Sequence, residues 1–192
     1  MINHIDLSSV LRRTVCDLYS DLVTRPTGAA VRLGIEQQLA ALAEPTLTVI
    51  DFSHVGLLDF SCADEIVAKL LLRYTAQPVG GNEAMAAPRD AYFVFRGLHE
   101  SHLDAIECVL DRHGLAIVAQ SADGAVTLVG SIGDEERQAW ETLCRIGRCA
   151  AAELSRAAGF APQRSEAVLG ALARRKLVML FDESYVAVGA TT

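Results

Sequence analysis

An alternation of strand-like and helix-like segments constrains the fold of this chain more than any other feature. Residues 47–52, with the sequence LTVIDF, form an apolar run of strand length, which is typical of a buried strand. Similar short runs occupy residues 92–95, 115–119 and 126–129. Segments with the helical spacing of about 3.6 residues lie between the first three runs. Strands that alternate with helices predict an α/β fold, in which helices pack on a sheet.

The same periodicity sets the expected bounds of the helices. We expect them over residues 10–22, 27–43, 62–74 and 100–113. The first should end before Arg25, because a residue that precedes proline avoids the α region, and Gly114 should end the last. Asp123 and Gly124 form a hairpin turn signal. Residues 75–90 contain prolines and glycines without an apolar period, so we expect a mobile loop there.

Composition excludes several classes of protein. Of the 192 residues, 51% are hydrophobic and 21% are charged, so a sizeable core is available and wholesale disorder is not expected. The net charge of -7 is opposite to what a protein that coats nucleic acid non-specifically needs. No apolar stretch reaches the roughly 18–20 residues that span a bilayer, and the N-terminus lacks a secretory pattern. The five scattered cysteines indicate reduced thiols, so we expect a cytoplasmic protein without membrane contact.

Charge and glycine spacing divide the chain in two. Residues 1–133 carry a net charge of -7, and residues 134–192 carry a net charge of zero. The stretch Gly130-Ser131-Ile132-Gly133 lies at the border, and its two glycines indicate a hinge. We therefore predict an N-terminal domain over residues 1–130 and a C-terminal domain over residues 134–192. The second is near the lower size limit for folding alone.

The most informative motif is the segment LTVIDFSHVGLLDFSCADEIVAKLLL, residues 47–72. An apolar strand ends in Asp51, the apolar positions Val55, Leu57 and Leu58 follow, and Asp59 precedes a helix. This segment resembles the central motif of STAS domains, the fold of anti-sigma-factor antagonists, and its continuation over residues 61–65 is similar to an uncharacterised STAS-like branch. The order of elements agrees over residues 25–129. The resemblance implies a STAS-like α/β sheet that binds another regulatory protein.

The resemblance also implies the position of a switch. Antagonists of this family are switched by phosphorylation of the residue directly after the motif acid, which is Phe60 here, and Cys62 replaces the family's glycine. Ser61 is a displaced candidate, and a phosphate on it would meet the positive end of a helix dipole. Ser61 and Asp64 have the Ser-x-x-Asp spacing of a helix start, so we expect Ser61 to be an N-cap. The candidate partner-binding or switch residues are Asp59, Ser61 and Asp64.

The C-terminal residues carry a second pattern of three helices and a hairpin. We expect the helices over residues 135–145, 150–158 and 163–176, and the hairpin over residues 177–181 and 185–188. Gly159 falls between the second and third helices, where a positive φ is useful. The run AAELSRAAGFAPQRSEAVLGALARRKLV is similar to the helix-turn-helix core of MarR-like and ArsR-like bacterial regulators. The resemblance implies a winged helix-turn-helix domain.

The third of these helices would carry the contacts to DNA. Such a helix enters the major groove with its first turn, where glutamine suits an adenine edge and arginine a guanine edge. Arginines at its far end suit phosphates. The candidate DNA-binding residues are Gln163, Arg164, Ser165, Arg174 and Arg175. The acidic hairpin tip and the zero net charge oppose DNA binding, so a packing or dimerisation module stays an alternative.

Two other groups of residues indicate a ligand or an enzyme. Cys62 lies at the start of a predicted helix, a position that lowers the pKa of a thiol. His99 and His102 are three residues apart and share a helix face. Neither group has the ligand spacing of a known metal site, and no common nucleotide-binding or hydrolase motif occurs. We therefore expect no catalytic residue, no metal and no cofactor.

Together these features predict a non-enzymatic bacterial regulatory protein. Its STAS-like domain would bind a regulatory protein partner, and its winged helix would act on transcription, with double-stranded DNA as a candidate partner. A homodimer is the default expectation for a winged helix. Two alternatives stay open. One is a sequence-specific transcription factor whose STAS-like domain dimerises or senses, and the other is a small-ligand binder or enzyme that uses Cys62 or His99 and His102.

Overall fold

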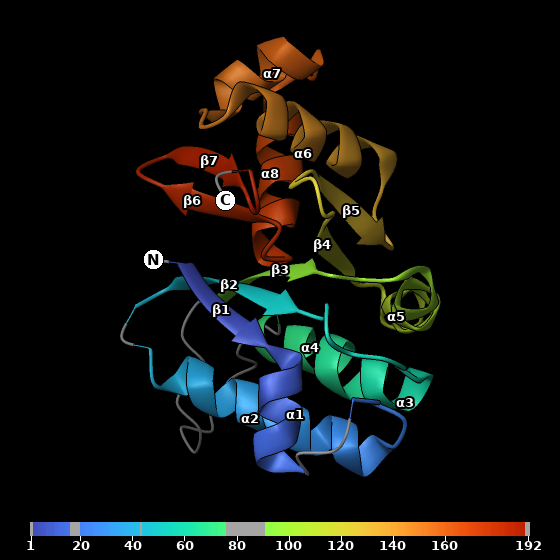
Figure 1. The fold of residues 1–192 in the computed structure, drawn as a ribbon. Helices are drawn as coiled ribbons and strands as arrows, with labels where there is room; N and C mark the ends of the chain where they lie inside the picture. Colours follow the sequence, from blue (N-terminus) through green and yellow to red (C-terminus); the bar gives the residue numbers. More distant parts are fainter. Residues whose placement is uncertain (1, 16–19, 43, 76–90, 191–192) are drawn as a thin grey trace, which may run out of the picture.

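A five-stranded sheet forms the centre of the computed structural model, which describes residues 2–15, 20–42, 44–75 and 91–190 (Figure 1). The first four strands are parallel, and the fifth is antiparallel to the fourth. They lie side by side in chain order: β1 (Ile2–Asp6), β2 (Thr46–Asp51), β3 (Ala91–Arg96), β4 (Ala116–Gln120) and β5 (Val126–Gly130). The predicted α/β fold is confirmed.

Strand β1 has no counterpart in the sequence prediction. Only two of its residues, Ile2 and Ile5, are apolar. They are three residues apart, so they do not show the alternation of apolar and polar residues that predicts a strand. Ile5 pairs with Ile50 of β2, and both side chains are fully buried. Pairing with β2, and not local propensity, therefore makes this segment a strand.

Helix α1 (Leu7–Thr14) differs in both bounds from the helix predicted over residues 10–22. The helix begins at Leu7, three residues before the prediction, because Asp6 is its N-cap. The Asp6 carboxylate accepts a hydrogen bond from the Ser8 N–H at 3.0 Å. Leu22 lies well beyond the helix and forms a bridge with Leu58. Residues 16–19 of the predicted helix lie outside the described residues.

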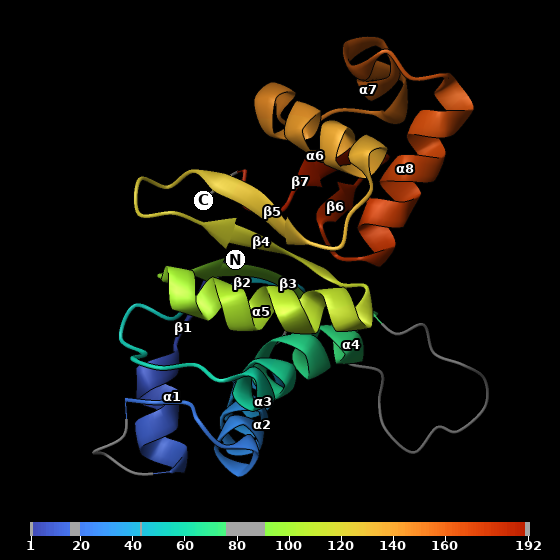
Figure 2. The same cartoon turned by 90° about the vertical axis from the view of Figure 1, so that its right-hand side faces the viewer.

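In the described residues, the helices that connect the parallel strands pack on one face of the sheet (Figure 2). They are α1, α2 (Arg25–Ala40), the continuous run of α3 (Phe60–Ala63), the π-helix η1 (Asp64–Lys69) and α4 (Leu70–Thr75), and α5 (Glu100–His113). Helix α2 starts two residues before the prediction, since Thr24 caps it and Pro26 lies in the first turn, where a missing N–H costs nothing. Helix α5 has the predicted bounds and ends at Gly114 in the left-handed conformation. Of the predicted mobile loop, residues 76–90 lie outside the described residues.

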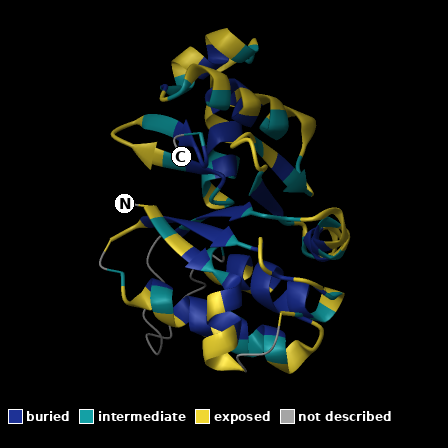
Figure 3. Cartoon of the chain, in the orientation of Figure 1, coloured by how far each residue is buried: buried dark blue, intermediate teal, exposed yellow. Residues whose placement is uncertain are grey.

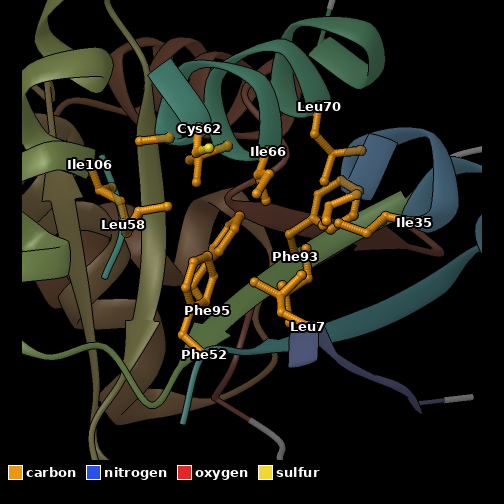
Figure 4. Close-up of a cluster of buried hydrophobic side chains, with 14 of the residues drawn as sticks. Leu7, Ile35, Phe52, Leu58, Cys62, Ile66, Leu70, Phe93, Phe95 and Ile106 are labelled. Atoms are coloured by element: carbon orange, nitrogen blue, oxygen red, sulfur yellow. The ribbon is translucent and has the colours of Figure 1, made fainter. Parts of the chain in front are cut away.

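The main hydrophobic core lies between this helical layer and the sheet (Figure 3). Phe95 of β3 and Phe52, directly after β2, belong to it, and their ring centres are 6.3 Å apart. Ile35 of α2, Ile66 of η1 and Ile106 of α5 belong to the same buried cluster (Figure 4). The core therefore joins three helices that are far apart in the chain.

The C-terminal residues form three helices and a hairpin in the predicted order. The elements are α6 (Asp134–Ile146), α7 (Ala151–Ala158), α8 (Pro162–Arg174), β6 (Val178–Phe181) and β7 (Ser184–Ala187). Gly159 ends α7 with a φ of +74°, as its place between the two helices predicts. The antiparallel pair β6–β7 closes the unit.

This C-terminal part covers the second face of the sheet (Figure 2). Val94 of β3 belongs to the same buried cluster as Trp140 of α6 and Leu177. A Cβ atom on Gly189, whose φ is +86°, would lie 3.0 Å from the side chain of Val126 and 3.5 Å from that of Val94. Residues 134–190 therefore bury the face that the other helices leave open.

The connection predicted as a hinge is packed against the sheet. Gly130 has a φ of +100°, and a Cβ atom there would lie 2.6 Å from the carbonyl oxygen of Leu115. The Ser131 N–H donates a hydrogen bond to the same carbonyl at 2.8 Å. A glycine at position 130 therefore allows the end of β5 to approach the backbone at Leu115 closely. The division into domains at residues 130 and 134 stays a prediction.

Candidate functional site

The loop of residues 52–59, which follows β2, ends at Asp59, the first of the predicted partner-binding residues. Leu22 and Leu58 form a parallel β-bridge, which fixes the end of this loop. The Leu22 N–H donates to the Leu57 carbonyl at 2.7 Å, and the Asp59 N–H donates to the Leu22 carbonyl at 2.8 Å. Leu22 and Leu58 are both buried. Because alternate residues of an extended chain point to opposite sides, the neighbours of these two leucines are turned outward.

Exposed apolar side chains gather around Asp59 on that outward side. Leu57 is 58% exposed, Val23 is 45% exposed and Phe60 is 38% exposed. The Arg112 guanidinium carbon lies 5.8 Å from the centre of the Phe60 ring. We call Val23, Leu57, Phe60 and Arg112 the Leu57 surface. Apolar side chains with an aromatic ring and an arginine have the composition of a protein-binding surface.

Asp59, and not Ser61, is the N-cap of α3. The Asp59 Oδ1 accepts the Cys62 N–H at 2.8 Å, and the Ser61 hydroxyl donates to the Asp59 carboxylate at 2.9 Å. The predicted capping role of Ser61 is wrong, because the helix starts at Phe60 and Ser61 is already inside it. A phosphate on Ser61 would replace this hydrogen bond by repulsion from the Asp59 carboxylate, so the geometry does not favour the predicted switch.

Asp64 is buried and belongs to an ion-pair network between α2, η1 and α5. Its carboxylate lies 2.9 Å from Arg25 Nη1 and 2.8 Å from His113 Nε2. Glu65, also buried, contacts Arg25 at 3.0 Å and Arg32 at 3.3 Å, and it pairs with Lys69. Asp64 is therefore not part of the Leu57 surface, and its burial and ion pairs do not favour the predicted contact with a partner.

The pKa values of the two buried acids reflect these contacts. Burial by itself raises the pKa of Asp64. The hydrogen bonds from Arg25 and His113 lower the pKa by more than burial raises it, so the pKa of Asp64 lies below its usual value. Burial likewise raises the pKa of Glu65, and hydrogen bonds from Lys69 and Arg25 outweigh that effect. Both carboxylates are therefore charged at neutral pH, and their role is to tie α2 to the π-helix.

Helix α8 presents only some of the predicted DNA contacts. Gln163 and Arg174 are exposed, but Ser165 is fully buried, which does not favour the predicted contact of Ser165 with DNA. Arg175 is tied down, because its Nη1 lies 2.9 Å from Glu136 and its Nη2 donates to the Ser131 carbonyl. It joins α8 to α6 and to the end of β5, and this contact competes with the predicted contact to phosphate.

Acidic side chains lie beside the start of α8. Arg164 is exposed, but its Nε donates to Glu135 of α6 at 2.7 Å. Residues 134–136, all acidic, form the first turn of α6. The hairpin tip at Asp182 and Glu183 is exposed and adopts positive φ values of +44° and +65°. These charges oppose a phosphate backbone.

Cys62 does not have the properties of a reactive thiol. Its side chain is fully buried, and the Sγ atom lies 3.0 Å from the Thr24 carbonyl oxygen. Burial, with the nearby Asp59 carboxylate, raises the pKa of Cys62 to about 12. The thiol is therefore protonated at neutral pH, and the geometry does not favour the alternative that Cys62 is a nucleophile.

The two histidines position a loop. His102 is fully buried, its Nδ1 accepts the His99 N–H at 3.3 Å, and its Nε2 lies 3.0 Å from the Gly56 carbonyl oxygen. These two contacts suit the neutral ring with its proton on Nε2. In the described residues, no group of three or more His, Cys, Asp or Glu side chains is arranged to hold a metal ion.

The exposure of Leu57 is the feature of this site that the motif does not reveal. The motif treats Val55, Leu57 and Leu58 alike, yet Val55 and Leu58 are buried and Leu57 is exposed. Two consecutive residues of an extended segment cannot both face the core. The two consecutive leucines, Leu57 and Leu58, could therefore have predicted that one of them is exposed.

Within residues 2–15, 20–42, 44–75 and 91–190, no helix is both long and apolar enough to cross a bilayer. No protein-family model, no curated protein and no solved structure matches the chain.

Proposed function

We propose that this chain is a regulatory protein that acts by binding another protein through the Leu57 surface. The observation that carries the proposal is the exposure of Leu57 and Phe60 next to the Asp59 cap and of Val23, which follows the bridge residue Leu22. Burying a leucine or phenylalanine side chain contributes about 1.5–3 kcal/mol. Three such side chains with an adjacent arginine suffice for the energetic centre of an interface.

The backbone beneath the Leu57 surface supports this proposal because it is held in place. The Leu57 N–H donates to Asp21 Oδ1 at 3.1 Å, and the Gly56 N–H donates to the Ser20 carbonyl at 2.9 Å. His102 fixes the Gly56 carbonyl from α5. A preformed surface loses little conformational entropy when a partner binds.

The resemblance of residues 47–72 to the STAS motif supports a regulatory role. Leu57 and Phe60 of the Leu57 surface lie within that motif, beside the acid Asp59 that the resemblance assigns to partner binding. We propose that the sheet is STAS-like and that residues 134–190 form a winged helix that conveys partner binding to transcription. The order α6, α7, α8, β6 and β7 supports the second part. A dimer through the winged helix and a place in the cytoplasm belong to the same proposal.

Photo-crosslinking at residue 57 tests the proposed binding surface. With a photoreactive amino acid at position 57 of the full chain in its native cells, we expect a specific crosslinked product. The same amino acid at position 33 is the matched control, since Leu33 is 51% exposed and lies on α2. Phe60→Asp should abolish the product at position 57, because it places a charge in the interface. Identical products at positions 57 and 33 would contradict the proposal.

DNA binding by α8 is the second candidate function. Gln163 and Arg174 are exposed, and they are eleven residues apart, which is close to three helical turns, so they share the outward face of α8. In a salt series with genomic duplex fragments, we expect Gln163→Ala to reduce discrimination between sites by about 1–3 kcal/mol. Arg174→Ala should weaken binding to all sequences and lower the salt slope by about one. Ser165→Ala is the buried control. The absence of salt-dependent binding would leave α8 with a packing or dimerisation role.

A further inference from the structure

A pocket of about 500 Å³ opens at the carboxyl ends of β2, β3 and β4. Its lining includes Asp51, Ser53, Arg96, His99, Gln120 and Ser121. The volume is within the usual range of small-molecule sites. The pocket is separate from the side chains of the Leu57 surface, and the proposed function does not use it.

The Asp51 carboxylate is occupied by protein donors and fixes Arg96. One oxygen accepts the Ser53 N–H at 2.9 Å and the Ser53 hydroxyl at 2.6 Å. The other lies 2.9 Å from Arg96 Nε and 2.7 Å from Arg96 Nη2. Burial raises the pKa of Asp51, but these bonds from Ser53 and Arg96 lower it below its usual value. Asp51 therefore has little capacity left to accept from a cationic ligand.

Arg96, in contrast, has donors to spare. Its Nη1 group makes no hydrogen bond within the part of the chain that the structure describes, and 41% of its side chain is exposed. A guanidinium held from one side by a carboxylate presents its remaining N–H groups in a fixed direction, a geometry that suits an oxyanion. His99 is at the N-terminal end of α5, where the helix dipole adds to the positive potential.

The backbone around the pocket is fixed by two close contacts. Gly97 has a φ of +69°, and a Cβ atom there would lie 2.5 Å from the Ser53 nitrogen, so only glycine allows this approach. The His99 N–H donates to His102, whose ring is anchored on the Gly56 carbonyl. Arg96 and His99 are therefore presented by a rigid wall, as a preorganised binding site requires.

From this arrangement we infer that the pocket binds a small anionic ligand with a carboxylate or phosphate ester group, and that Arg96 holds the anionic oxygens. Ser121 and Gln120 also line the pocket, and the Ser121 hydroxyl donates its proton within its own loop, so its oxygen can only accept from a ligand. The ligand class follows from the spare donors of Arg96 and the saturated acceptors of Asp51.

Titration calorimetry and thermal unfolding of the full chain test this inference with two probes, glycerol 3-phosphate and malate. At least one probe should bind and raise the Tm as its concentration rises. Arg96→Gln should weaken that binding by about tenfold or more, and Arg96→Lys should retain part of it. Arg156→Gln is the matched control, because Arg156 is an exposed arginine of α7 that does not line the pocket and donates a hydrogen bond to the Ala152 carbonyl of its own helix.

A second variant separates ligand binding from folding, since Arg96→Gln also leaves Asp51 without its cation. Ala122→Phe adds bulk at an exposed position of the pocket rim and keeps the Asp51–Arg96 pair. It should abolish binding while the far-UV circular dichroism stays unchanged. Binding of the phosphate ester, of malate or of both supports the inference and identifies the accepted anion. No binding of either probe at up to about 10 mM, or undiminished binding by either Arg96→Gln or Ala122→Phe, would overturn it.

Discussion

Replacing Trp140 by alanine is expected to destabilise the whole chain by about 4 kcal/mol in one cooperative transition. Trp140 is 2% exposed, and its Nε1–H donates to the Leu177 carbonyl at 3.1 Å. It belongs to the cluster that also contains Val49 and Val94 of the sheet. The substitution removes a hydrogen bond and leaves a cavity where the sheet and the C-terminal helices meet, so both should unfold together.

Urea denaturation followed by far-UV circular dichroism measures this loss, and amide hydrogen exchange locates it. We expect amides of β3 and of α8 to lose protection by similar amounts. Leu180→Ala on β6 is the control, since Leu180 is 53% exposed and its removal should change the stability by less than about 0.5 kcal/mol. Loss of protection in α8 alone would show instead that residues 134–192 unfold as an independent domain.

Glu65→Gln is expected to lower the free energy of unfolding at pH 7 by about 2 kcal/mol. Removing one partner of a buried ion pair costs about 3–5 kcal/mol, and we take a smaller value because Arg25 and Lys69 are 48% and 42% exposed. Arg32, at 20% exposure, keeps Glu36 as a partner at 2.7 Å, which also limits the loss. Gln38→Glu, at a half-buried position of α2 outside the network, is the charge-change control, and an equal loss there would contradict the expectation.

The same substitution should reduce the dependence of stability on pH. The pKa values of Asp64 and Glu65 are below their ordinary values in the folded state, so the unfolded chain binds more protons in acid. Their contribution is complete above the unfolded pKa values of roughly 4 and is lost as the pH falls through the lower folded values. The wild-type stability should thus fall steeply below about pH 4, and that of Glu65→Gln should fall less. Parallel curves from pH 7 to pH 2 would show that Glu65 has no such role.

Local signals account for the elements that the sequence predicts well. The apolar run of β2 and the 3.6-residue period of α5 each specify an element without distant partners, and Gly114 and Gly159 mark helix ends through a positive φ. Strand β1 has no such local signal, because its conformation depends on pairing with β2, more than 40 residues away in the chain. Its prediction would have required knowledge of the sheet.

The site residues show the same division between local and distant information. The burial of Ser165 could have been predicted, since it is three, four and seven residues from Val168, Leu169 and Leu172, which form the buried face of α8. The burial of Asp64 could not, because its partners Arg25 and His113 are 39 and 49 residues away. The pocket at Arg96 likewise depends on three strands that only the fold brings together.

The sequential order of the strands determines how the molecule is completed during synthesis. Strands β1 to β5 leave the ribosome before the C-terminal helices, and each can pair with a neighbour that is already present. Their connecting helices cover one face at once, whereas the face with Val94 stays bare until residues 134–190 have emerged. During that interval the nascent chain exposes an apolar sheet surface, which is the condition under which chaperones bind and aggregation begins.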